Sequence, residues 1–221
     1  DRSDPSNIKA GVSLFVDGSI NSLRGGRTST DNKATIASKT RLTLTAQSDI
    51  TVTGDLTYKN PVVDSNGNAV AGVSSIENVF GIFTNDGNLN LAPNASYVEQ
   101  STATSGTDLG LEIDAAVITF NKNTSNDGGA IKGSIVYTGS TTPGSSDRWK
   151  LIGSRVQSKI NTIGYNYRDI FFDTRFSGGT FSPPFFPGTT YQILKPVANQ
   201  VDITLVDTPV PSAMSWFRDN N

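Results

Sequence analysis

The sequence has no cysteine and no histidine. Without cysteine there can be no disulfide, no Cys-ligated zinc and no thiol nucleophile. Without histidine the commonest general base, every Ser–His–Asp arrangement and the His-rich metal sites are excluded. Catalysis would depend on carboxylates, lysine or tyrosine, so the sequence favours a protein that is not an enzyme and needs no cofactor.

Charge, long apolar runs and methionine are also scarce. Charged residues are 17% of the 221 residues, below the usual ~25%. Ser, Thr, Asn and Gly are abundant instead, which indicates many strands and turns. No stretch approaches about 18 consecutive apolar residues, so the chain shown does not predict a membrane span. Because Met214 is the sole methionine, we expect that residue 1 is not the native start, and that either a leader was removed or the chain was trimmed. The lack of thiols and the abundance of Ser, Thr and Asn favour an extracellular protein at the bacterial cell surface.

The net charge of −2 hides an uneven distribution. Residues 24–41 carry five basic residues against one acid, residues 42–120 nine acids against one base, and residues 121–195 nine bases against four acids. Such segregation is typical either of a charged face for an anionic partner or of neighbouring segments whose charges cancel.

Apolar and polar residues alternate at period two through most of the chain, the pattern of a strand with one dry face. The clearest run is 42–58, which would be roughly 56 Å long at about 3.3 Å per residue. Ordinary strands have about 3–10 residues, so the chain must turn within this run while the same parity stays inward. Ser48 and Gly54 are the small inward residues where such corners fit. Corners of this kind predict a β-solenoid.

Further alternating or apolar runs predict the remaining strands. They are residues 12–20, 79–91, 109–120, 131–137 and 149–160. Polar segments at 60–77, 92–108 and 121–129 are expected to leave the body as long loops or side hairpins. The predicted fold is therefore all-β, a β-solenoid over 1–195 followed by a tail, 196–221, with a short strand around Ile203.

Aromatic residues and prolines gather near the end of this region. They predict a C-terminal cap that covers bare apolar surface at one end of the solenoid. A stacking platform for sugars is the alternative. The cap residues are Phe171, Phe172, Phe176, Phe181, Phe185 and Phe186.

Five strings resemble a known family. They are ITVTGDLTY (50–58), VFGIFTNDGNLNL (79–91), LEIDAAVITF (111–120), WKLIGSRVQ (149–157) and FFDTRFSGGTFSPPFFPGTTYQIL (171–194). They are similar to the bacterial pilus-associated, PilX-like secreted family of unknown function, which includes the large ComZ-type minor pilins. The resemblance implies a β-solenoid ectodomain behind an N-terminal pilin-type helix that this chain lacks. It implies no catalytic residues.

Basic and aromatic residues alternate in one segment of the chain. Lys150, Arg155, Lys159 and Arg168 lie near Trp149 and two tyrosines. Basic groups could follow a phosphate backbone while rings stack on bases, so these four residues are the candidate DNA- or anion-binding site. Ordinary surface charge is the alternative.

Two acidic patterns are weaker candidates. Residues 64–68 resemble the start of a calcium loop, but Ala69 and Ser75 occupy the positions where that loop has Gly and Glu, so we expect a plain turn and no metal. Asp49 and Asp55 share the outward parity of the long run and could form a glycosidase pair. Solvated surface carboxylates are the alternative.

Taken together, these patterns predict a non-enzymatic structural or adhesive ectodomain similar to a minor pilin, acting in attachment or DNA uptake. Its expected partners are other pilin or envelope subunits, with DNA or surface polysaccharide as further ligands. It would meet a membrane only through an N-terminal anchor absent from this chain. The alternatives are a stand-alone polysaccharide- or DNA-binding module and, behind it, a polysaccharide-cleaving enzyme that uses carboxylates.

Overall fold

The computed structural model divides the chain into two compact units, Asp1–Pro184 and Phe185–Asn221. The predicted boundary lies eleven residues later, between 195 and 196. Described residues are 11–26, 34–98, 110–121, 132–145, 147–161, 163–178, 181–186, 190–193 and 203–206.

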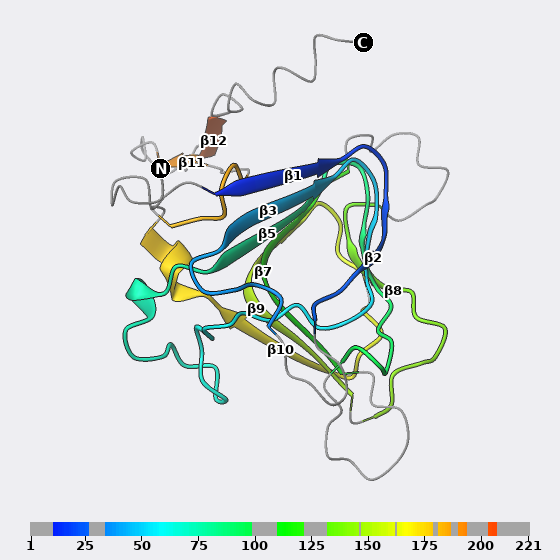
Figure 1. Ribbon diagram of the computed structural model, residues 1–221. Coiled ribbons are helices and arrows are strands. Elements are labelled where there is room, and N and C mark those ends of the chain that lie inside the picture. Colours follow the sequence, from blue (N-terminus) through cyan, green and yellow to red (C-terminus); the bar gives the residue numbers. More distant parts are fainter. Residues whose placement is uncertain are drawn as a thin grey trace, which may run out of the picture. The chain divides into compact units, whose positions relative to one another are not determined.

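A six-stranded sheet forms one side of the first unit (Figure 1). All its neighbouring strands run parallel, in the order β1-β3-β5-β7-β9-β10. The strands are β1 (Val12–Val16), β3 (Arg41–Ala46), β5 (Val79–Thr84), β7 (Leu111–Thr119), β9 (Arg148–Gln157) and β10 (Tyr167–Phe172).

A four-stranded parallel sheet contains the strands that come between these along the chain, up to β8. They are β2 (Ile20–Leu23), β4 (Ile50–Val52), β6 (Leu89–Leu91) and β8 (Ile135–Tyr137). The chain thus passes from one sheet to the other and back. Short 3-10 helices, η2 (Val73–Ser75) and η3 (Thr174–Gly178), lie in the connections. Across the described ranges, no helix is both long enough and apolar enough for a membrane span.

One hydrophobic cluster joins the two sheets. Leu44 and Ile82 contribute to it from the six-stranded sheet, and Ile50 and Leu89 from the four-stranded sheet. In register, Leu44 lies beside Ile82, and Ile50 lies beside Leu89, so like side chains stack from strand to strand. Burial of such aliphatic rows stabilises the fold by roughly 25 cal/mol per Å² of apolar surface.

The long alternating run 42–58 bends twice, and its even-numbered side chains stay on the buried side. β3 ends at Ala46, and the chain bends at Ser48 before β4 begins at Ile50. A second bend contains Gly54. The even-numbered Leu44, Ala46, Ile50, Val52, Leu56 and Tyr58 all belong to the buried cluster. The predicted turning of this run with one parity inward is confirmed.

The predicted β-solenoid, with its C-terminal cap, is wrong for the described residues. A closed solenoid needs neighbouring segments to pair all the way around the axis, whereas the described residues of the first unit form two open parallel sheets. In the described parts of the connections between the four-stranded and six-stranded sheets, parallel pairing is limited to isolated bridges of Ile36 with Tyr58 and of Leu56 with Ile113. Period-two alternation reports which side chains face a dry interior, but it does not show whether the intervening segments pair.

In the second unit, the described residues include an antiparallel pair, β11 (Thr190–Ile193) with β12 (Ile203–Val206). β12 lies at the short strand expected around Ile203.

A candidate carboxyl site beside β7

The candidate site lies beside the first half of β7, which has no pairing partner in β5. β5 pairs with β7 only from Ala116 to Thr119. Beside the first half of β7, Leu56 takes that place through one parallel bridge to Ile113. The Leu56 N–H donates to the Glu112 carbonyl at 2.9 Å, and the Asp114 N–H donates to the Leu56 carbonyl at 2.7 Å. A single bridge leaves the next backbone donors on either side without the carbonyls that a longer ladder would supply.

Two aspartates supply the missing acceptors. Asp55 Oδ1 accepts the Glu112 N–H at 2.8 Å, and Asp114 Oδ2 accepts the Tyr58 N–H at 2.7 Å. Side-chain carboxyl oxygens therefore replace backbone carbonyls at both ends of the Leu56 bridge. Asp55 and Asp114 are both buried, in keeping with these contacts to the backbone.

Asp114 has an oxygen without a partner. Its side chain is buried, with 2% of the residue exposed, and Oδ1 has no hydrogen-bond partner. Burial, with a smaller contribution from the neighbouring Glu112 charge, raises the pKa of Asp114 to about 8. The group consequently holds its proton at neutral pH and can donate as well as accept hydrogen bonds.

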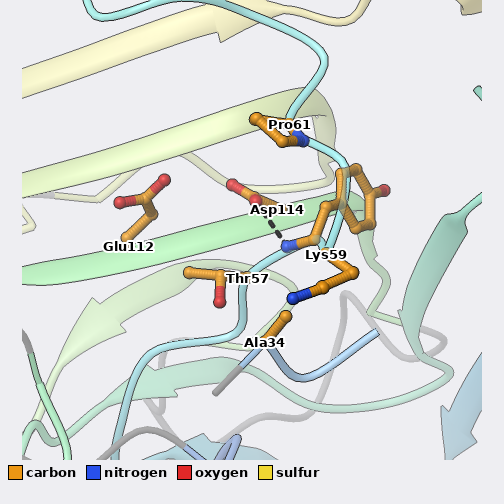
Figure 2. A pocket seen from close by; sticks show the side chains of 7 residues that line it. Ala34, Thr57, Lys59, Pro61, Glu112 and Asp114 are labelled. Carbon is orange, nitrogen blue, oxygen red and sulfur yellow. Dashed lines mark hydrogen bonds between the residues drawn. The ribbon is translucent and has the colours of Figure 1, made fainter. Parts of the chain in front are cut away.

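A half-open cavity of about 290 Å³ lies beside this carboxyl group. Figure 2 shows Glu112 and Asp114 of β7 on one side and Thr57, Lys59 and Pro61 of the preceding segment around the rest. Most of these lining groups are polar, and they include hydrogen-bond donors and acceptors. The arrangement can therefore bind a small molecule that both gives and receives hydrogen bonds.

Glu112 is held by Lys150, one of the four residues of the predicted DNA site. Lys150 Nζ lies 3.1 Å from Glu112 Oε1, and the two residues are register partners on β9 and β7. On the other side of β9, Asp169 of β10 is the register partner of Lys150. Lys150 therefore lies between two acidic residues, which reduces the positive charge it offers to an anion.

The other three predicted DNA contacts are spread along the sheet. Arg155 lies five residues from Lys150 on β9, about 16 Å at ~3.3 Å per residue. Lys159 follows the end of β9, and its N–H donates to the Gly133 carbonyl at 3.0 Å. Arg168 is beside Trp149, and its Nε donates to the Tyr165 carbonyl at 3.2 Å. Binding of DNA by these residues remains a prediction.

The predicted cap residues fall into three groups. Phe171 and Phe172 end β10, where Phe171 packs against the core and Phe172 is exposed. Phe176 and Phe181 stack with their ring centres 6.1 Å apart. Phe185 and Phe186 belong to the second unit.

The segment after β10 is bound to the start of β3. Arg41 Nη2 donates to the Ser182 carbonyl at 3.0 Å, and the Thr43 hydroxyl donates to the Pro184 carbonyl. The Phe181 ring is also 5.2 Å from the Arg41 guanidinium carbon. These contacts connect the proline-rich segment to a strand far earlier in the chain.

A buried ion pair was missed by sequence reasoning. Arg175 Nη2 lies 2.6 Å from Asp173 Oδ2, with side chains 3% and 0% exposed. Arg175 Nη1 donates to the carbonyls of Ile76 and Asn78 at 2.8 and 2.9 Å, just before β5. The guanidinium also lies 4.4 Å from the centre of the Phe181 ring. The Asp-x-Arg-Phe motif was the available signal, because a charged pair among many aromatics is a candidate for burial.

The two weaker acidic candidates serve as local acceptors. Asp49 accepts the Asn88 N–H at 2.8 Å and the Asn90 side-chain amide at 3.3 Å, so it fastens the turn between β5 and β6. Asp55 instead binds the Glu112 backbone. Asp49 and Asp55, which could have formed a glycosidase pair, therefore have separate hydrogen-bonding roles, and the alternative of a solvated surface carboxylate is wrong for Asp55, which is buried.

In the 64–68 segment, Asp64 Oδ1 accepts the N–H groups of Asn66 and Asn68, each at 2.9 Å. The Asn68 N–H is the main cause that lowers the pKa of Asp64. This is the expected plain turn. Over the part of the chain that the structure describes, no three acidic side chains gather as metal ligands.

Comparisons with known proteins give no relative. No family model, no curated protein and no solved structure matches this chain.

Proposed function

We propose that this chain is a non-enzymatic structural and adhesive domain of a bacterial cell surface, acting beside pilin or other envelope subunits. The observation that carries the proposal is that the buried acids bind backbone groups and hold neighbouring segments together. Asp55 and Asp114 hold a segment against β7, while Glu112 is paired with Lys150. Each of these carboxyl groups therefore has a partner within the fold, Asp114 through Oδ2 alone.

The two-sheet body supports the same proposal. Stacked rows such as Leu44 beside Ile82 give a close-packed interior with low compressibility. From this body, the polar segment after Asn60 leaves as a short hairpin-like excursion in which Val63 pairs with Ala69. A stiff body that carries polar loops is suited to display and attachment rather than to turnover.

Attachment of the source bacterium to a surface tests the proposal. We expect cells without the gene to attach several-fold less, and the wild-type gene to restore attachment. A gene encoding Arg175→Met should fail to restore it because the body is disrupted, whereas Arg148→Met, at an exposed ion pair, should restore it. Unchanged attachment of the deletion strain, or release of reducing ends from glycans by the purified chain, contradicts the proposal.

DNA binding is tested separately on DNA–cellulose with the purified full chain. Salt-sensitive retention that Arg155→Ala and Arg168→Ala weaken supports the predicted basic site, because phosphate contacts release counterions. Retention that is unchanged in both variants contradicts that site.

A further inference from the structure

The cavity beside β7 has a hydrogen-bonding group that the fold leaves unused. Asp114 Oδ2 accepts the Tyr58 N–H, but Oδ1 is buried without a partner in the cavity wall. Leaving such a buried group unsatisfied destabilises the protein. A ligand hydroxyl that hydrogen-bonds Oδ1 would recover part of this cost.

The lining groups discriminate between classes of ligand. Lys59 lines the same cavity as Glu112 and Asp114 and disfavours a cation, while the charge of Glu112 disfavours a carboxylate or phosphate. Asp114 is uncharged at pH 7 and can give or receive a hydrogen bond. Thr57 adds a hydroxyl group, and Pro61 and Ala34 add small apolar surfaces. Donors, acceptors and a small apolar wall together suit a neutral polyhydroxyl molecule.

The volume of the cavity limits the size of the ligand. Its volume of about 290 Å³ is at the lower end of the ~300–1,000 Å³ found for small-molecule sites. This space suits one sugar ring better than a large ligand. Because the cavity is half-open, that ring could be one residue of a longer chain whose remainder lies in solvent.

We propose that the cavity lined by Asp114, Glu112, Thr57 and Lys59 binds one neutral sugar residue of a surface polysaccharide. The sugar would be the ligand through which the protein acts in the adhesion proposed above. The role of sugar binding in the cell rests on that proposed function, but the binding itself does not. Binding to the purified chain and attachment of cells are separate measurements, so either can fail while the other holds.

Saturation-transfer NMR and calorimetry on the full chain at pH 7 provide the test. The probes are methyl β-glucoside, N-acetylglucosamine and glucuronate. We expect at least one of the two neutral sugars to bind saturably with a Kd of roughly 1 mM, and glucuronate to bind about tenfold more weakly, a difference of about 1.4 kcal/mol. No saturable binding of either neutral sugar, or tighter binding of glucuronate, overturns the proposal.

A cavity-filling variant and a matched control locate the binding. Ala34→Leu places a larger side chain in the cavity wall and should reduce the affinity at least about tenfold. Ala37→Leu, at an exposed position three residues later, should leave it unchanged. Both variants are first compared with the wild type by thermal melting. If Ala34→Leu melts normally and binds as the wild type does, the sugar does not occupy this cavity.

Glu112→Gln tests the polar side of the wall. Its amide still accepts hydrogen bonds, but it loses the charge that disfavours glucuronate. We expect the preference for neutral sugars over glucuronate to fall several-fold. An unchanged preference contradicts the proposed role of Glu112 in excluding anionic sugars and thereby the assignment of this cavity.

Discussion

The six-stranded sheet and the segment beside the first half of β7 are held by different interactions. In the sheet, backbone ladders repeat and aliphatic side chains stack, as Leu44 does with Ile82. Beside β7, one bridge at Leu56 is extended by the carboxyl groups of Asp55 and Asp114. A regular ladder forms wherever apolar side chains alternate along the strand. The irregular pairing beside β7 depends on acidic side chains at two particular positions.

A similar contrast separates the buried ion pair from the exposed ones. Asp173 and Arg175 are almost fully buried, and Arg175 holds the backbone just before β5. Arg148 and Asp169 are joined at 3.0 Å, but the Arg148 side chain is 59% exposed. Substitutions at these ion pairs, in the core and at Asp114 test whether the buried and the regular interactions stabilise the fold most.

Arg175→Met should reduce the free energy of unfolding by about 3–5 kcal/mol, because it leaves Asp173 buried and unpaired. Urea denaturation measures the loss. The double variant Asp173→Leu with Arg175→Met should be more stable than Arg175→Met alone, since it removes the unpaired charge. Equal stability of the single and double variants would show that the loss comes from the Arg175 contacts with Ile76 and Asn78 rather than from the charge.

Ile82→Ala and Leu56→Ala compare the interior of the sheet with the single bridge. Both side chains are fully buried, so each change should cost about 2–5 kcal/mol through lost burial and a cavity. We expect similar losses although Leu56 has only one bridge, because the cost depends on packing. A Leu56→Ala loss below about 1 kcal/mol would mean that the segment can collapse onto the vacated space.

The pKa of Asp114 makes stability depend on pH. Its value of about 8 in the folded chain lies above the ordinary 3.8, so between these values the folded state binds more protons and stability falls as pH rises. Between pH 6 and 8 the wild type should lose about 2 kcal/mol through this group.

Asp114→Asn should remove most of that loss, as measured by urea denaturation at each pH. Glu112, Asp55 and Lys150 also act on this carboxyl group, but none is substituted in the comparison. Asp169→Asn, at the exposed pair, is the control and should keep the wild-type slope. An equal slope in Asp114→Asn and the wild type would show that Asp114 titrates near its ordinary value.

Arg148→Met should have the smallest effect, below about 1 kcal/mol, because water and salt screen an exposed pair. Thermal melting at low and high salt measures it. A loss comparable with that of Arg175→Met would mean that the Arg148 contact with the Tyr167 ring, at 5.0 Å, stabilises the sheet more than its exposure indicates.

Much of the strand arrangement was predictable because parity is a local property. The run 42–58 shows this, since its even residues enter the core through two bends. The closed solenoid was not predictable from that pattern, because pairing of the intervening segments depends on backbone partners distant in sequence. The acids illustrate the same limit: Asp55 was singled out, but its partner is the backbone of Glu112 and not Asp49.

From the amino-acid sequence alone one can read which residues alternate, where small residues permit turns, and that histidine and thiol chemistry are absent. The fold was needed to show that Asp114 lies behind a neighbouring segment with one oxygen unpaired, and that Arg175 is buried before β5. This is because strand pattern follows from neighbouring residues, whereas burial of a charge depends on which distant segments cover it.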